Sequence, residues 1–154
     1  EDILIEIFQH RYLPENYISL ESLRLSFYKN LSTATSMDEI DNIQYHLKNR
    51  FGPLPDPLNN LIKECRLRLL AATTGVLSIR MRGCGVVCKI ISNGVPGFMD
   101  AVLEYIEGFL GGRGVDFHLL PSPGLDLLLC IHIPHEIDKY SLLSSLLDKL
   151  KALA

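Results

Sequence analysis

Hydrophobic and polar residues alternate at the start of the chain and then recur with a helical period. Residues 2–8 alternate strictly, with Ile3, Ile5 and Ile7 on one side, which predicts a β-strand at a sheet edge. A connector containing Pro14 follows, because proline interrupts regular structure. Apolar residues then recur three and four positions apart over about 20–31, 36–51 and 56–74, which predicts three amphipathic helices.

Local signals set the ends of the second and third helices. Ser36 and Glu39 have the spacing of a capping box, in which each side chain accepts a hydrogen bond from the other residue's backbone N–H. Gly52 is placed to end the second helix in the left-handed conformation, and Pro53 prevents its continuation. Asp56 and Pro57 predict the N-cap and first helical residue of the third helix.

After Gly75 the period changes to that of strands separated by two further helices. Strands are predicted over 76–82, 86–92, 115–120 and 125–133, and helices over 98–110 and 135–150. The expected fold class is α+β: a strand and a three-helix segment, followed by a ββαββα unit with helices packed on a mainly antiparallel sheet. We expect one domain over 1–154, with subregions 1–75 and 76–154.

Composition narrows the class of protein. The 154 residues are 47% hydrophobic and 21% charged, as in ordinary globular domains, and the net charge of −3 argues against a domain that mainly grips phosphates. No signal peptide or membrane-spanning run is visible, and a start at Glu1 suggests a fragment of a longer protein. We expect the four cysteines, Cys65, Cys84, Cys88 and Cys130, to be reduced and structural, which favours the cytoplasm.

The motifs that suggest catalysis are incomplete. Gly83-x-Gly85 and Gly111-Gly112-x-Gly114 lack the Lys-Ser/Thr pair of a phosphate-binding loop, and we interpret them as turns. His118, His132 and His135 would form a metal or general-base site, or the centre of a small enzyme, only if they converged. We therefore expect no catalytic, cofactor-binding or metal-binding residues.

A basic strip offers an alternative function. Between residues 63 and 89 six cations stand against Glu64 alone, and Arg80 and Arg82 share one face of a strand. The strip could bind a nucleic-acid backbone or an acidic partner, or it could be an ordinary solvated surface. Its members are Lys63, Arg66, Arg68, Arg80, Arg82 and Lys89.

Two sequence segments resemble the C-terminal domain of bacterial transcription-repair coupling factors. The first is Arg24-Leu-Ser-Phe-Tyr-Lys29 and the second is Arg50-Phe-Gly-Pro-Leu-Pro-Asp-Pro57, preceded by a connector similar to the family's Ile-Pro-x-x-Tyr-Ile segment. The motif residues are Tyr12, Pro14, Tyr17, Arg24, Tyr28, Phe51, Gly52, Pro53 and Pro55. Phe51, Gly52 and Pro53 are interpreted as residues that build the helix joint.

The resemblance implies a regulatory domain of an ATP-driven double-stranded DNA translocase, which releases stalled RNA polymerase and recruits excision repair. The motor, with its ATP and magnesium, would lie outside this chain, and the chain itself would bind no cofactor. The implied partner is an N-terminal repair-helicase-like module of the same protein, whose docking hides the surface for the damage-recognition ATPase.

The family's contact lies at the end of the second helix, and this sequence differs there. The outward positions, commonly acidic in the family, are His46 and Asn49, and Arg50 is retained. Charge-assisted pairs are about twice as strong as neutral hydrogen bonds. We therefore expect the interface to persist at His46, Asn49 and Arg50 but to be less electrostatic.

Overall fold

The computed structural model describes residues 2–83 and 85–153, and its contacts divide the chain into two units. The helical unit is Phe8–Leu69, and the sheet unit combines Glu1–Ile7 with Leu70–Ala154. The predicted subregions differ from these units at the leading strand, because that strand pairs with a strand of the second half. No helix in the described ranges has both the length and the apolar character needed to cross a bilayer.

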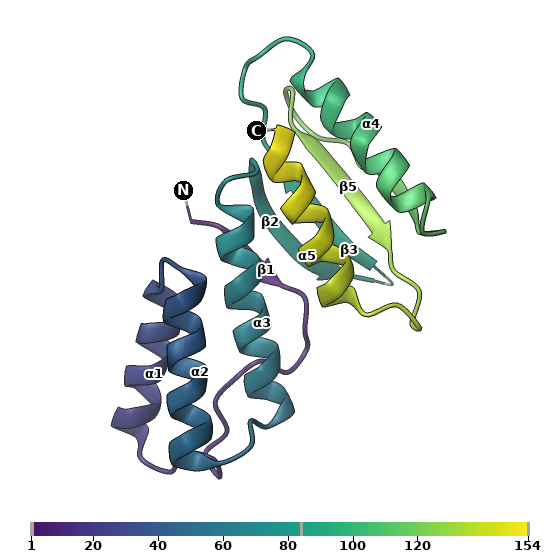
Figure 1. The fold of residues 1–154 in the computed structure, drawn as a ribbon. Helices are drawn as coiled ribbons and strands as arrows, with labels where there is room; N and C mark the ends of the chain where they lie inside the picture. Colours follow the sequence, from purple (N-terminus) through teal and green to yellow (C-terminus); the bar gives the residue numbers. More distant parts are fainter. Residues whose placement is uncertain (1, 84, 154) are drawn as a thin grey trace. The chain divides into compact units, whose positions relative to one another are not determined.

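The helical unit contains α1 (Glu21–Thr33), α2 (Met37–Phe51) and α3 (Asp56–Ala71, whose last two residues belong to the sheet unit). Ile40, Leu47 and Leu58 are completely buried in its core, and Leu13 and Ile18 of the connector join them. The first helix was predicted to begin at about residue 20, but Leu20 precedes α1 in an extended conformation and is 62% exposed. Figure 1 shows α1 and α2 side by side.

The helix ends follow the sequence signals with three corrections. Ser36 Oγ accepts from the Glu39 N–H at 3.2 Å, as predicted, but the Glu39 carboxylate accepts from the Thr35 N–H and not from that of Ser36. Gly52 has φ +91° and ψ −167°, which is not the left-handed helical conformation but a region essentially restricted to glycine. α3 begins at Asp56 itself, one residue early, because the Pro55 carbonyl accepts the first helical hydrogen bond.

The sheet unit follows the predicted order of elements. Its members are β1 (Leu4–Glu6), β2 (Val76–Arg82), β3 (Gly85–Ile90), α4 (Phe98–Gly111), β4 (Asp116–Leu119), β5 (Leu127–His132), α5 (Lys139–Leu150) and a short 3-10 helix (Lys151–Leu153). The strand order is β1-β2-β3-β5-β4, antiparallel except for the parallel pair β1–β2, so the mainly antiparallel α+β prediction is confirmed. α5 starts at Lys139 and not at residue 135, because the Asp138 carboxylate caps it by accepting from the Ser141 N–H.

The two faces of this sheet have different surroundings. α4 and α5 contact each other and pack on one face, where Leu129 and Ile131 of β5 are completely buried (Figure 1). Because strand side chains alternate, Cys130 and His132 lie on the other face, as do Arg80 and Val87, which pair across β2 and β3. Arg80 is exposed, so solvent reaches this second face.

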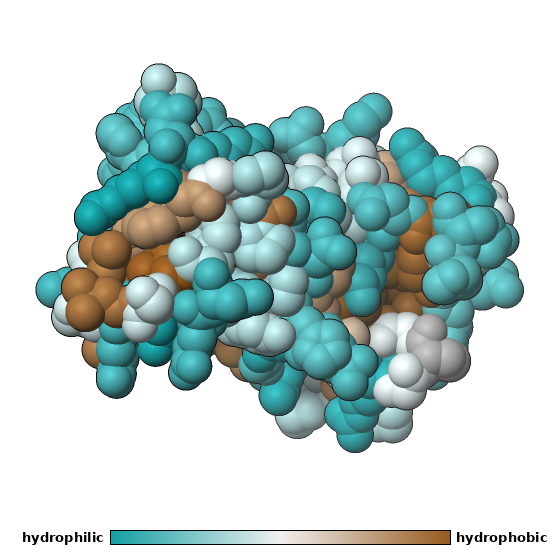
Figure 2. All heavy atoms as spheres, turned by 90° about the horizontal axis from the view of Figure 1, so that it is seen from below, coloured by the Kyte–Doolittle hydropathy of each residue, from teal (hydrophilic) through white to brown (hydrophobic). Residues whose placement is uncertain are grey.

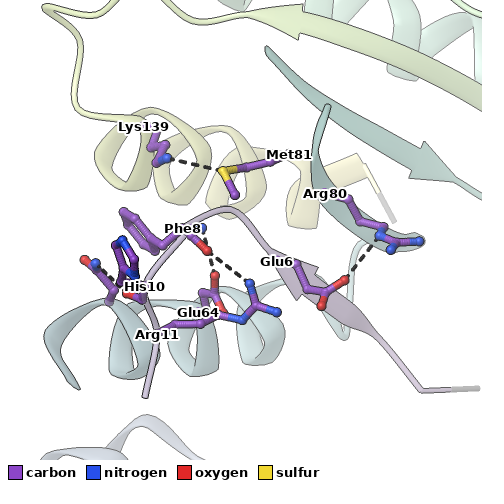
Figure 3. Close-up of polar contacts among 9 residues, drawn as sticks. Glu6, Phe8, His10, Arg11, Glu64, Arg80, Met81 and Lys139 are labelled. Atoms are coloured by element: carbon purple, nitrogen blue, oxygen red, sulfur yellow. Dashed lines mark hydrogen bonds and ion pairs between the residues drawn. The ribbon is translucent and has the colours of Figure 1, made fainter. Parts of the chain in front are cut away.

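Polar contacts hold the start of each unit (Figure 3). In the helical unit the buried Glu64 of α3 accepts from the Phe8 N–H at 3.0 Å and pairs with Arg11 Nε at 3.1 Å. In the sheet unit Arg80 Nε lies 3.2 Å from a Glu6 carboxylate oxygen, which ties β1 to β2. A buried carboxylate of this kind is stabilised only when it is paired and hydrogen-bonded, as Glu64 is.

A pair of glycine substitutions tests the packing of the sheet unit. A Cβ at Gly85 would overlap the Ile131 carbonyl oxygen, whereas a Cβ at Gly108 of α4 would meet no atom within 4 Å. Gly85→Ala should therefore lower the free energy of unfolding by roughly 1–3 kcal/mol. Gly108→Ala should raise it by about 0.5–1 kcal/mol, because alanine favours the helix. Urea unfolding followed by circular dichroism measures both, and equal effects would contradict the observed packing.

Candidate interdomain interface

The last turn of α2 presents the three residues expected at the interface. His46, Asn49 and Arg50 are all exposed, and their spacing places them on one side of the helix. Ile40 and Leu47 are completely buried, and they lie about 100–130° around the helix from the middle of these three residues, which fixes the rotation of the helix about its axis. The predicted outward position of His46 and Asn49 is therefore confirmed, Arg50 is exposed beside them, and the interface itself stays a prediction.

The corner after α2 is held by aromatic packing and by one hydroxyl group. The Phe51 ring contacts those of Tyr17 and Phe27, with centroids 5.6 and 6.1 Å apart. The Tyr17 hydroxyl lies 2.8 Å from the Gly52 carbonyl oxygen and 3.0 Å from that of Leu47, and it donates to this pair. Burial raises the pKa of this hydroxyl, so it stays a donor at neutral pH. Phe51 packs in the joint, as the sequence suggested.

The other motif residues hold the connector against the helices. The Leu13 N–H donates to the Tyr28 hydroxyl at 2.6 Å, and Arg24 donates to the Ile18 carbonyl at 2.7 Å. The Tyr12 N–H donates to the Pro57 carbonyl, while the carbonyls of Pro14 and Pro55 accept bonds from turns that follow them. Residues far apart in the sequence thus form one scaffold behind the last turn of α2.

The exposed surface carries an aromatic residue that the sequence reasoning missed. Tyr45 is 62% exposed, and its ring meets that of His46 edge-on at 5.8 Å. The Arg50 guanidinium lies 5.2 Å from the Phe51 ring centroid, within the range of a cation–π contact. The signal was present: Tyr45 lies four residues before Asn49, which places it on the same side of the helix. We call Tyr45, His46, Asn49 and Arg50 the α2 surface.

The helical unit also exposes hydrophobic surface. Figure 2 shows apolar side chains gathered on the helical unit, at the left of the view. Three large apolar or aromatic residues of this unit are more than half exposed, and they are Leu20, Leu25 and Tyr45. Exposed apolar area of this kind is typical of surfaces that meet another protein.

The structure divides the basic strip between the two units. Lys63, Arg66 and Arg68 belong to the helical unit, and Arg80, Arg82 and Lys89 to the sheet unit. Arg66 pairs with Asp41 at 2.8 Å, Arg68 donates to backbone carbonyls, including those of Leu31 and Ala34, and Arg80 pairs with Glu6. These three cations make contacts within their own units. Nucleic-acid binding by the strip stays a prediction.

The histidines and cysteines are arranged differently from the sequence-based expectation. His118 and His132 lie together with Cys130, whereas His135 is not a member of this group. Cys65, Cys88 and Cys130 are free and buried, and burial raises the pKa of the Cys88 thiol to about 12. Cys84 lies outside the described residues, and so does its spacing from Cys88.

Comparisons with known proteins point to one family. The family model of the TRCF domain matches residues 9–96. The transcription-repair-coupling factor of Haemophilus influenzae is 42% identical over 67 residues, which are 44% of this chain and 6% of that protein. That of Mycobacterium bovis is 32% identical over 87 residues, covering 56% of this chain and 7% of that protein. The chain thus spans a small part of these relatives.

A solved structure shares the whole fold. The crystal structure of a C-terminal domain of transcription-repair coupling factor superposes with a TM-score of 0.74 and 18% identity, over 98% of this chain and 94% of that one. The family match includes the connector, the corner and the α2 surface described above. Because this match covers more than half of the chain, the chain belongs to the TRCF domain family of transcription-repair coupling factors.

Proposed function

We propose that this chain is a non-catalytic regulatory domain that restrains the motor of a transcription-repair coupling factor. The α2 surface docks on an N-terminal, repair-helicase-like module of the same protein. While docked, the domain hides the surface that recruits the damage-recognition ATPase. Engagement of RNA polymerase releases it.

The main support for this proposal is that the α2 surface is exposed and held in place by the corner behind it. Its four side chains are exposed, yet the helix turn that bears them is fixed by Phe51 and by the Tyr17 hydroxyl. A rigid, exposed turn loses little conformational entropy on binding. Tyrosine and arginine, both present here, are the residue types enriched at the energetic centres of interfaces.

The activity of the whole protein belongs to this proposal, since the chain matches only 6–7% of the relatives described above. An ATP-driven double-stranded DNA translocase would lie elsewhere in the parent protein and would bind ATP and magnesium there. The domain described here would restrain that motor and would not itself catalyse a reaction. Its partners would be reached through the parent protein, with RNA polymerase and the excision-repair machinery among them.

The composition of the α2 surface predicts a weakly electrostatic contact. Arg50 is the one member of this surface from among the Lys, Arg, Asp and Glu residues, and Asn49 is uncharged. Binding between exposed charges weakens as salt screens them, whereas burial of aromatic and apolar area does not. The affinity of this domain for its module should therefore depend little on salt.

Calorimetric titration of this chain with the N-terminal module of its parent protein checks the docking. The dissociation constant should change less than about threefold when ionic strength rises from about 0.1 to about 1 M, although the Debye length falls from about 10 to about 3 Å. Tyr45→Ala and Arg50→Ala should each weaken binding by about 5–30-fold, or roughly 1–2 kcal/mol.

Lys149→Ala is the matched control for that titration, because it also removes one cation. Lys149 is exposed on α5 of the sheet unit and is not a member of the α2 surface. Its substitution should leave affinity unchanged. Steep loss of affinity with salt would contradict the weakly electrostatic contact, and no binding at all would refute the docking. Binding of duplex DNA that falls steeply with salt would favour the basic strip instead.

Restraint of the motor is tested in the full-length parent protein. If docking restrains the motor, Tyr45→Ala and Arg50→Ala should raise ATP hydrolysis in the absence of RNA polymerase, because the undocked population grows as affinity falls. Lys149→Ala should leave hydrolysis at its original rate. If the two interface variants dock more weakly but hydrolyse ATP at the unchanged rate, docking does not restrain the motor. That result would refute the regulatory role.

The corner provides a further test through Tyr17. Tyr17→Phe keeps the ring contact with Phe51 but removes the donor for two carbonyl oxygens. The free energy of unfolding should fall by about 1–2 kcal/mol. Docking should weaken a fewfold, because the turn that bears Arg50 is less well fixed. Tyr12→Phe, at a ring that is 44% exposed, is the control and should change stability by less than about 0.5 kcal/mol.

A further inference from the structure

Three potential metal ligands meet at one edge of the sheet unit. The ligand atoms of His118, Cys130 and His132 all lie within 4.8 Å of one another. The Nδ1 atom of His118 is 2.7 Å from Nε2 of His132, and the two rings stack with their centroids 4.8 Å apart and an angle of 20° between them. This group lies in the sheet unit, outside the α2 surface.

The strand register explains why these residues meet. His118 of β4 stands directly opposite Cys130 of β5, and His132 follows Cys130 by two positions. Directly opposed residues have Cβ atoms about 4.5–5.5 Å apart, and residues two apart on a strand share a face. All three side chains therefore lie on the face opposite to Leu129 and Ile131, which are buried on the helix-covered side.

The surroundings leave room for the cysteine sulfur and access for solvent. A Cβ at Gly85 would lie 3.4 Å from the Cys130 sulfur, so glycine at this position keeps space beside it. Cys130 is buried, and His118 is exposed. Asp116, also exposed, stands directly opposite His132 on the same face and places a negative charge near the group.

The chemistry of this ligand set is that of zinc. Two imidazole nitrogens and one thiolate are common zinc ligands, and three protein ligands with an open fourth position are typical of sites that keep a water molecule. Bonds of about 2.0–2.3 Å in tetrahedral geometry place ligand atoms about 3.3–3.6 Å apart. The imidazole nitrogens would separate by less than about 1 Å from their hydrogen-bonded distance to reach this spacing.

We propose that His118, Cys130 and His132 bind one zinc ion, with a water molecule in the fourth position. On binding, the thiol of Cys130 releases its proton to solvent, and zinc replaces the hydrogen bond between the two imidazoles. The ion then links the edge strand β4 to β5. The zinc ion and the Cys130 thiolate together carry a charge of +1, which the Asp116 carboxylate balances.

Metal titration of the reduced, metal-free 154-residue chain tests the site. Zinc should bind with one-to-one stoichiometry in competition with a chromophoric chelator. Cobalt(II), used as a spectroscopic substitute, should give a thiolate-to-cobalt charge-transfer band and the intense visible bands of a tetrahedral ion. Zinc should raise the midpoint of thermal unfolding, because it binds the folded chain.

Substitutions distinguish this site from other thiols and histidines. His118→Asn and His132→Asn should weaken zinc binding at least about tenfold, and Cys130→Ser should also abolish the charge-transfer band. Cys88→Ala and His135→Asn are the matched controls and should bind zinc as the unaltered chain does. A charge-transfer band that survives Cys130→Ser, or that disappears with Cys84→Ala or Cys88→Ala, would overturn the proposal.

A second measurement needs no variant and covers the case in which one fails to fold. In the nuclear magnetic resonance spectrum of the unaltered chain, zinc should shift the imidazole resonances of His118 and His132 and leave those of His135 in place. Shifts confined to other histidines, or no shift at one equivalent of zinc, would refute the site. Neither result depends on docking of the α2 surface.

Discussion

The hydrogen bond from the Tyr17 hydroxyl to the Gly52 carbonyl joins the connector before α1 to the end of α2, and the helical unit depends on this joint. Gly52 has a backbone conformation that other residues avoid, so the chain turns sharply there and directs its carbonyl toward Tyr17. Phe51 fills the space between Tyr17 and Phe27. The residues that identify the family are therefore those that fix a helix end, while the residues beside them face solvent.

The sequence predicted the elements well because their signals are local. Hydrophobic period, the Ser36 cap and the breaks at Gly52 and Pro53 act within a few residues, and the helices formed where these signals placed them. The differences arose where a neighbouring group competed. Asp138 caps α5 in place of residues nearer to 135, and the Pro55 carbonyl opens α3 one residue early. Rules based on the spacing of a few residues do not reveal which of two adjacent polar groups accepts the first hydrogen bond of a helix.

The candidate sites likewise differ in whether they depend on residues that are close together or far apart in the sequence. The exposure of His46 and Asn49 follows from helical geometry once Leu47 is buried, so it could be predicted. The meeting of His118 with Cys130 could not, because it depends on the register between β4 and β5, and a shift of one residue would place them on opposite faces. Cys130 was for this reason expected to be only structural, and His135 was grouped with residues that it does not join.

The parallel pairing of β1 with β2 has a consequence for the order in which the two units fold. Leu4 pairs with Ser78, so the whole helical unit lies within the loop that this pairing closes. Closing a loop of about 70 residues costs chain entropy that grows with the logarithm of its length. The helical unit is contiguous in sequence and rich in short-range contacts, which form quickly. The helical unit is in effect an insertion in the sheet unit, and its folding shortens the loop that β1 and β2 must close. The first strand of the chain is therefore expected to be among the last to join the sheet.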